Sequence, residues 1–115
     1  MASSQETADF LLDQLAGSGR FSVRRMFGEY CLYLDAKPVA LLCDDQLYVK
    51  STDAGRTLLA RVEEGFPFPG ARLHLLVTAD LWEDREWLAR LLTTTASVLP
   101  EPKPKKPRAR KKPAV

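Results

Sequence analysis

Few residues in this sequence have the type and spacing that catalysis or metal binding requires. The single histidine, His74, lies in an apolar segment, with no acid or cysteine at the spacing of a metal ligand or catalytic base. No serine occupies a GxSxG elbow, and no glycine-rich phosphate loop precedes a helix. Asp44 and Asp45 are adjacent carboxylates, but they fall between two strand patterns, where aspartate is a common turn residue. The sequence therefore predicts no enzymatic centre, no metal site and no cofactor.

The segment RRMFGEY, residues 24–30, places two arginines beside a glycine, a combination that can bind an anion. Successive residues of a strand point to opposite faces, so Arg24 and Arg25 cannot both face one ligand. We interpret Gly28 as a turn residue and Phe27 as a side chain that packs beneath the turn. The exposed arginine of the pair remains a candidate contact with a protein partner.

The only two cysteines, Cys31 and Cys43, are too few for a secreted disulfide framework and form no CxxC pair. A two-residue turn at Asp35-Ala36 would place Cys31 opposite Ala40 and turn Cys43 to the other face of the sheet. A three-residue loop would place the two cysteines opposite each other. We expect the two-residue turn and no disulfide.

Two tryptophans lie near the start of the last predicted helix. Trp87 falls at the edge of a leucine stripe, which predicts a core position, whereas Trp82 projects away from that stripe and is expected to be partly exposed. An exposed Trp82 is a candidate anchor of a protein interface. The alternative is a rim position that covers the loop PFPG, residues 67–70.

Hydrophobic periodicity and turn residues predict the order α-β-β-β-β-α-β-α. Short turns make neighbouring strands antiparallel, so the class is α+β, an antiparallel sheet of about five short strands with flanking helices. Both faces of strand 30–34 are apolar, which predicts a sheet that is covered on both sides or curled around a core. The first expected helix is opened by a capping box at Ser3 and Glu6 and carries an apolar stripe of Ala8, Leu11, Leu12 and Leu15. The second runs from Thr52 to about Gly65, and the third is opened by a capping box at Asp80 and Glu83 and ends near Leu99. The expected strands are 20–26, 30–34, 39–43, 47–50 and 71–78.

Charge divides the chain into a body, residues 1–99, and a tail, residues 100–115. The tail has seven Lys/Arg and one acid, a net +6, whereas the body has ten basic and fourteen acidic residues, a net −4. Five prolines and almost no large apolar side chain predict a disordered tail. The tail's candidate nucleic-acid contacts are its basic residues Lys103, Lys105, Lys106, Arg108, Arg110, Lys111 and Lys112.

The sequence contains neither a signal peptide nor an apolar run long enough to cross a bilayer, so we expect a cytoplasmic protein without a membrane partner.

The run from Phe21 to Asp53, with the later GFPFPG, resembles the TfoX (Sxy) N-terminal domain family over residues 5–98. The shared pieces are the Arg-Met-Phe-Gly step, a Tyr-bearing strand, two acidic turns and Leu-Tyr-x-Lys, in that order. The chain departs from the pattern at Glu29, where members commonly have a second glycine, and at Ala36, where an Asp-Gly turn is usual. The longer members carry a second helical domain, which the sixteen tail residues cannot form, so the resemblance is to a stand-alone domain.

The resemblance implies a small α+β domain without established catalytic residues. The best-known members regulate competence for DNA uptake together with a catabolite-activator-type transcription factor. We therefore expect a non-enzymatic regulatory or adaptor domain that binds a protein, with a transcription factor as a candidate partner and nucleic-acid contact through the tail. Two alternatives remain open: a pure protein-interaction module with an inert solubilising tail, and a small-molecule-binding domain.

Overall fold

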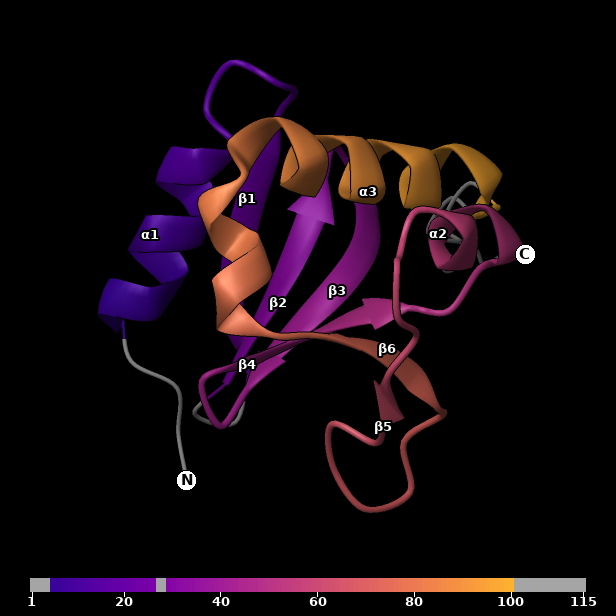
Figure 1. Cartoon of the computed structure of the whole chain (residues 1–115). Helices are drawn as coiled ribbons and strands as arrows, with labels where there is room; N and C mark the ends of the chain where they lie inside the picture. The colour runs from indigo at the N-terminus through magenta and orange to yellow at the C-terminus, as the bar shows by residue number, and fades with distance from the viewer. Residues whose placement is uncertain (1–4, 27–28, 101–115) are drawn as a thin grey trace, which may run out of the picture.

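The structure, a computed structural model that describes residues 5–26 and 29–100, contains a six-stranded sheet with its main helices on one face (Figure 1). The strands lie in the order β1-β2-β3-β4-β6-β5, and all neighbouring pairs are antiparallel, which confirms the α+β class. The elements are α1 (Gln5–Gln14), β1 (Phe21–Met26), β2 (Glu29–Leu34), β3 (Lys37–Cys43), β4 (Gln46–Lys50), α2 (Asp53–Thr57), β5 (Glu64–Gly65), β6 (His74–Val77), the 3-10 helix η1 (Ala79–Glu83) and α3 (Arg85–Val98).

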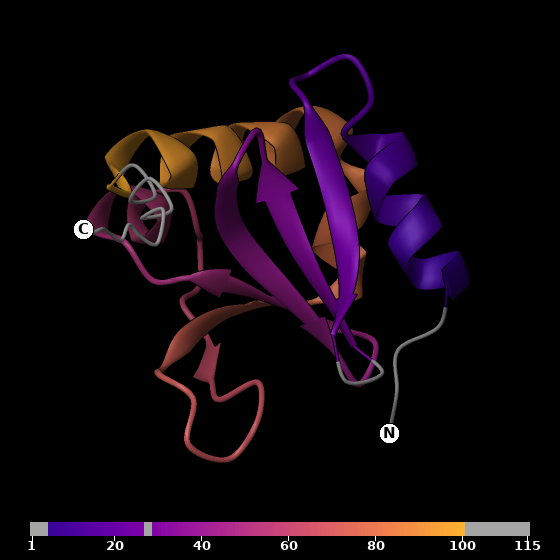
Figure 2. The ribbon, with the colours of Figure 1, turned by 180° about the vertical axis from the view of Figure 1, so that it is seen from behind.

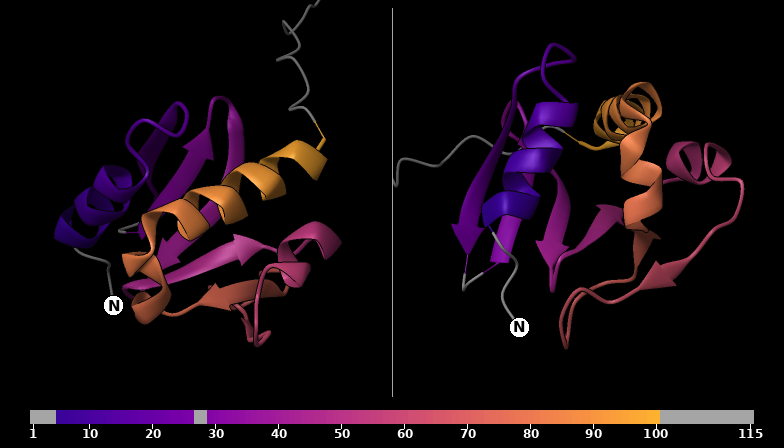
Figure 3. Two further views of the ribbon diagram at one scale, coloured as in Figure 1. Left: turned by 45° about the horizontal axis from the view of Figure 1, so that its top comes forward. Right: turned by 60° about the vertical axis from the view of Figure 1, so that its left-hand side comes forward.

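The helices α1 and α3 lie on the same side of β1–β3, and Figure 2 shows these strands from the opposite side, where the described chain places no helix. The sheet curls, so that α3 lies between β1–β3 on one side and β4 and β6 on the other (Figure 3). Of the two arrangements that the apolar strands predicted, the structure therefore has the curled one. No helix in the described residues is both long and apolar enough to cross a membrane.

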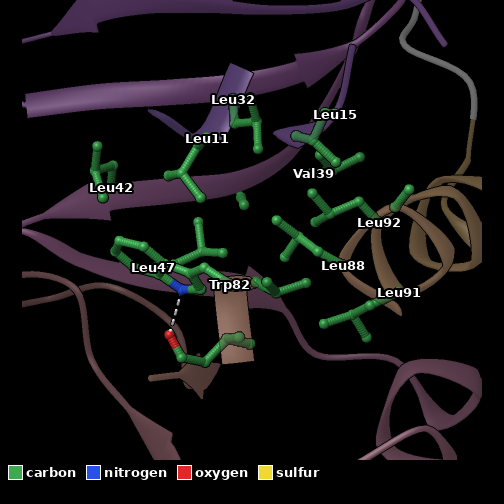
Figure 4. Close-up of a cluster of buried hydrophobic side chains, with 14 of the residues drawn as sticks. Leu11, Leu15, Leu32, Val39, Leu42, Leu47, Trp82, Leu88, Leu91 and Leu92 are labelled. Atoms are coloured by element: carbon green, nitrogen blue, oxygen red, sulfur yellow. Dashed lines mark hydrogen bonds between the residues drawn. The ribbon is translucent and has the colours of Figure 1, made fainter. Parts of the chain in front are cut away.

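The core lies between the concave face of the sheet and the helices α1 and α3. The predicted stripe of α1 is confirmed, since Ala8, Leu11 and Leu15 are buried and Leu12 packs at the edge of the cluster. Side chains of α1, α3 and the strands point toward one another in this cluster (Figure 4). The fully buried large residues are Leu11, Leu15, Leu32, Leu42, Leu47, Leu75, Leu88, Leu91, Leu92, Val39, Val49 and Val77.

The second helix is shorter than the sequence predicts. Thr52 caps its N-terminus, as expected, by accepting a 2.9 Å hydrogen bond from the backbone N–H of Gly55. The helix ends at Thr57, however, and Glu64–Gly65 pairs with β6 as a sixth strand, β5. The Arg56 guanidinium is 2.6 Å from the Glu64 carboxylate, so this ion pair joins α2 to the added strand.

The third helix begins four residues later than the predicted capping box at Asp80 and Glu83. Those two residues lie in η1, and the N-cap of α3 is Asp84, whose carboxylate accepts a 3.0 Å hydrogen bond from the backbone N–H of Trp87. The predicted box was wrong because the extended backbone of Asp84, with φ −88° and ψ 92°, separates η1 from α3. The box proposed at Ser3 and Glu6 includes Ser3, which lies outside the described residues.

A β-bulge in β3 changes the expected register of the cysteines. Leu34 pairs with Lys37, which confirms the two-residue turn, but the register then shifts, so that Cys31 pairs with Leu41 instead of Ala40. Val39 is the extra residue and its side chain is fully buried. Cys43 consequently shares a face with Cys31, which corrects the predicted separation, and both cysteines are unbonded.

Lys37 stabilises the C-terminal end of α3. Its ammonium donates hydrogen bonds to the carbonyls of Ala96, at 2.8 Å, and Leu99, at 3.1 Å, where the helix dipole favours a cation. We expect Lys37→Met to lower the free energy of unfolding by about 1–2 kcal/mol, because the variant lacks the charged donor. Methionine keeps the aliphatic stem, so the loss reports on the hydrogen bonds. Urea denaturation of this variant beside Arg90→Met, at an exposed site on α3, measures the effect. Equal stability of the two variants would contradict it.

Candidate protein interface

The face of the sheet opposite α1 and α3, here called the open face, carries a row of side chains that crosses five strands. Residues opposite each other in an antiparallel pair point to the same face, and the register places Arg24, Cys31, Leu41, Tyr48 and Leu76 in one such row. Apart from the arginine, the row is apolar or aromatic. The open face therefore presents an apolar surface that the described helices leave uncovered.

Residues 66–71, here called the aromatic loop, border the open face. The backbone N–H of Ala71 donates a 3.0 Å hydrogen bond to the carbonyl of Phe68, and Gly70 has a φ of 86°. Pro69 and Gly70 are therefore the central residues of a turn, in positions where proline supplies a fixed negative φ and glycine accepts a positive one. This turn holds Phe68 in place although its side chain is 51% exposed, and Phe66 is 62% exposed.

Two hollows join the aromatic loop to the open face, and together they form what we call the groove. The first has a volume of about 450 Å³ and the second, which is wide open to solvent, about 700 Å³, and Pro67 and Phe68 line both of them. The first hollow is also lined by Met26, Glu29, Tyr30, Leu41 and Cys43, and the second by Asp44, Tyr48, Phe66, Pro69, Gly70 and Ala71. The groove is a mainly apolar cleft with exposed aromatic rings on one wall, which is typical of sites that bind a partner.

The acidic groups of the groove lie at the turn between β3 and β4. Asp44 and Asp45 both have left-handed backbones, with φ of 56° and 57°, as the tight turn that the sequence predicts requires. Glu29 reaches this turn from β2, and its two carboxylate oxygens accept from the backbone N–H of Asp44 at 3.2 and 3.3 Å. The departure from glycine at position 29 thus places a carboxylate against the turn.

The two cysteines beside the groove are poor nucleophiles. Burial raises the pKa of the Cys31 thiol, and burial, followed by the charge of the Glu29 carboxylate, raises the pKa of Cys43 to about 11. Thiolate is the reactive form, so neither group is prepared for nucleophilic or redox chemistry near neutral pH. These thiols act as small apolar side chains of the open face.

Alkylation by iodoacetamide tests this interpretation of Cys43. We expect labelling of the folded protein at pH 8 to be at least a hundredfold slower than in urea, because about one thiol in a thousand is ionised when the pKa is about 11. The rate should rise about tenfold per pH unit toward pH 11, provided that the fold persists. Mass spectrometry locates the label, with Cys43→Ser as the control. Rapid labelling at pH 7 in the folded state would contradict the prediction.

His74 has a structural environment. Its side chain is buried, and its Nδ1 is 2.7 Å from the carbonyl oxygen of Arg72. Within residues 5–26 and 29–100, no group of three or more His, Cys, Asp and Glu side chains is placed to hold a metal ion. The strand histidine is therefore a buried group whose Nδ1 has a hydrogen-bond partner.

The two arginines of β1 point to opposite faces, as the strand pattern predicts. The guanidinium of Arg24 lies 5.5 Å from the centre of the Tyr33 ring on the open face, and that of Arg25 lies 5.9 Å from the centre of the Tyr30 ring on the other face. Both side chains are exposed on β1, which is an edge strand. Arg24 is the one that shares a face with the groove.

The expected exposure of Trp82 is wrong, because its side chain is only 6% exposed. Its indole N–H donates a 3.0 Å hydrogen bond to the carbonyl of Val77 (Figure 4). Its ring centre lies 6.5 Å from that of Phe10. Trp87, expected in the core, is half-buried and donates from its indole N–H to the carbonyl of Leu58. Trp82 is therefore part of the core and lacks the exposure that an interface anchor needs.

The site that the structure assembles differs from the one that the sequence named. The loop PFPG was recognised as a loop, but Phe66, Phe68 and Met26 were not singled out. Two phenylalanines that alternate with prolines were the available signal, since proline stiffens a loop that keeps its aromatic rings in water. The basic tail residues from Lys103 to Lys112 lie outside the described part of the chain.

Comparison with known proteins identifies relatives of this chain. The model of the TfoX N-terminal domain family matches residues 13–98. A relative in Spirochaeta aurantia, described as an uncharacterized 12.7 kDa protein in the trpE 5′ region, is 44% identical over 106 residues. That alignment covers 92% of this chain and 91% of the relative. The two proteins are thus similar along almost their whole lengths.

Proposed function

Because the chain belongs to the TfoX N-terminal domain family, we propose that it is a non-enzymatic regulatory or adaptor domain that acts by binding a protein partner. The observation that carries the proposal is the groove, in which Phe66 and Phe68 are exposed on a loop held by a hydrogen-bonded turn. Burying such rings against a partner removes apolar surface from water at little cost in loop ordering. The arrangement therefore favours binding over catalysis.

The process that we propose for this protein also follows from its family. The partner in this proposal is a transcription factor, and the process is regulation of transcription or of competence for DNA uptake, in the cytoplasm. A folded body of net charge −4 has little attraction for nucleic acid, so we assign direct contact with nucleic acid to the basic tail. Body and tail then have different targets, a protein and a polyanion.

Affinity capture from the native cell tests the proposal. The tagged full chain is compared with a Phe66→Ser/Phe68→Ser variant, which removes both exposed rings, and with Val98→Ser, which removes an exposed apolar side chain from α3 on the other side of the sheet. We expect the wild type and Val98→Ser to retain the same partner and the double variant to lose at least nine-tenths of it. Equal retention by all three proteins would overturn the proposal.

A further inference from the structure

The charges along the groove identify the class of partner segment, an inference that rests on the proposed function. Among the described residues, each hollow has one charged lining residue, and in both hollows it is an acid: Glu29 in the smaller hollow and Asp44 in the larger. The contact between the Glu29 carboxylate and the Asp44 backbone brings the two together, and Asp45 adds a third carboxylate at the same turn. The negative charge is therefore concentrated at the β3–β4 turn, beside both hollows.

The rest of the open face has the opposite charge. Arg24 lies over Tyr33, two residues before Met26 on the same face of β1, and Lys50 lies at the far end of β4 from the turn that carries Asp44. A segment that binds along the groove thus meets apolar walls and, at the β3–β4 turn, carboxylates. Opposite charges beside a low-dielectric apolar surface attract more strongly than they do in open water.

We propose that the groove binds a segment of a partner protein that inserts a large apolar side chain beside Phe68 and places a Lys or Arg beside Glu29 and Asp44. The apolar anchor would supply most of the binding free energy, and the basic residue would set the orientation of the segment. Each hollow lies within the size range of about 300–1,000 Å³ that is usual for binding clefts.

Two other occupants match the groove less well. The tail of this chain is basic, but after Leu99 its only apolar side chains are proline, alanine and one valine, so it lacks a large anchor. A second copy of the chain would bring the acids of its own groove, and like charges that are brought together oppose association. A basic segment with an apolar anchor matches both properties of the site.

Matched fluorescent peptides test the inference on the full chain by anisotropy. The first peptide alternates lysine with leucine around a central phenylalanine, the second has glutamate in place of each lysine, and the third has serine in place of each apolar residue. We expect the first to bind at least tenfold more tightly than either of the others. We also expect added salt to weaken its binding, since the carboxylates contribute through charge.

Charge-neutral variants of near-identical shape separate the two features of the site. Glu29→Gln keeps an acceptor for the Asp44 N–H, and Asp44→Asn keeps a residue that tolerates the left-handed backbone, so the double variant retains the turn. This double variant should bind the first peptide at least fivefold more weakly, and Phe68→Ser at least tenfold more weakly. The controls Glu86→Gln and Val98→Ser on α3 should leave affinity unchanged.

The outcomes distinguish this inference from the proposed function. The inference is wrong if the first two peptides bind equally, if no peptide binds, or if the Glu29/Asp44 variant binds like the wild type. The proposed function is tested separately, because it still holds if the variant without the Phe66 and Phe68 rings loses the cellular partner. A tenfold gain in affinity on replacing the tail lysines and arginines by glutamine would make the tail the occupant. If the protein shows a monomer–dimer equilibrium that Phe68→Ser abolishes, the occupant of the groove is a second copy of the chain. Either result overturns the inference.

Discussion

Replacing Trp82 with alanine is expected to lower the free energy of unfolding by about 3–5 kcal/mol. The ring is 94% shielded from solvent, packs near Phe10 of α1 and joins η1 to the end of β6 through its hydrogen bond to Val77. Removing it leaves a cavity between α1 and the sheet and deletes the buried hydrogen bond to the Val77 carbonyl, and both cost stability. Urea denaturation followed by far-UV circular dichroism measures the loss.

Two further substitutions provide reference values for the loss of stability in Trp82→Ala. Trp87→Phe keeps a ring at a half-buried position and removes the hydrogen bond to Leu58, so it should cost about 1 kcal/mol. Phe66→Ser, at a side chain that is 62% exposed, should stay within about 0.5 kcal/mol of the wild type. A loss below about 1 kcal/mol for Trp82→Ala would contradict the central position assigned to this ring.

Removing residues 100–115 is expected to abolish binding of the protein to generic duplex DNA at low salt. The tail carries seven basic side chains and no aromatic ring to stack on bases, so binding should follow phosphate charge and ignore sequence. The plot of log affinity against log salt should have a slope of about −0.9 per phosphate engaged. If about six phosphates are engaged, affinity falls about a thousandfold between 50 and 200 mM salt.

A full-length variant with glutamine at each Lys and Arg of the tail is the matched control, because it keeps the length and the prolines and removes only the charge. It should bind DNA no better than the shortened chain. Fluorescence anisotropy with a labelled duplex of arbitrary sequence measures both. The tail has no role in nucleic-acid binding if the chain ending at Leu99 binds as well as the full chain, or if neither binds at low salt.

Both experiments leave the groove intact, so they test the core and the tail separately from the partner site.

The groove itself was only partly predictable from the sequence. Its loop followed from the prolines and glycine of residues 66–70, and its acidic turn followed from Asp44 and Asp45. That Asp44 of the turn and Phe68 of the loop line the same hollow depends on the pairing of β4 with β6, a contact between strands separated by more than twenty residues.

The sequence by itself determined the features that arise within a few neighbouring residues. Periodicity predicted the buried stripe of α1, the alternation of Arg24 and Arg25, and the four successive strands from β1 to β4, and each is confirmed. The two-residue turn at Asp35 and Ala36 also followed from local preference, since Asp35 takes the left-handed conformation, with a φ of 55°. These features depend on backbone geometry and on which face of an element is apolar.

Only the tertiary structure decided the features that depend on how elements meet. The bulge at Val39, which turns Cys31 and Cys43 to one face, exists because the curled sheet buries Val39 and Ala40 in the same core. Trp82 is buried because the chain breaks at Asp84 between η1 and α3, so the helical periodicity read from the leucines does not extend back to it. Strand β5 forms because β6 offers an unpaired edge. In each case packing between segments distant in the sequence outweighed a local preference of about 1 kcal/mol or less.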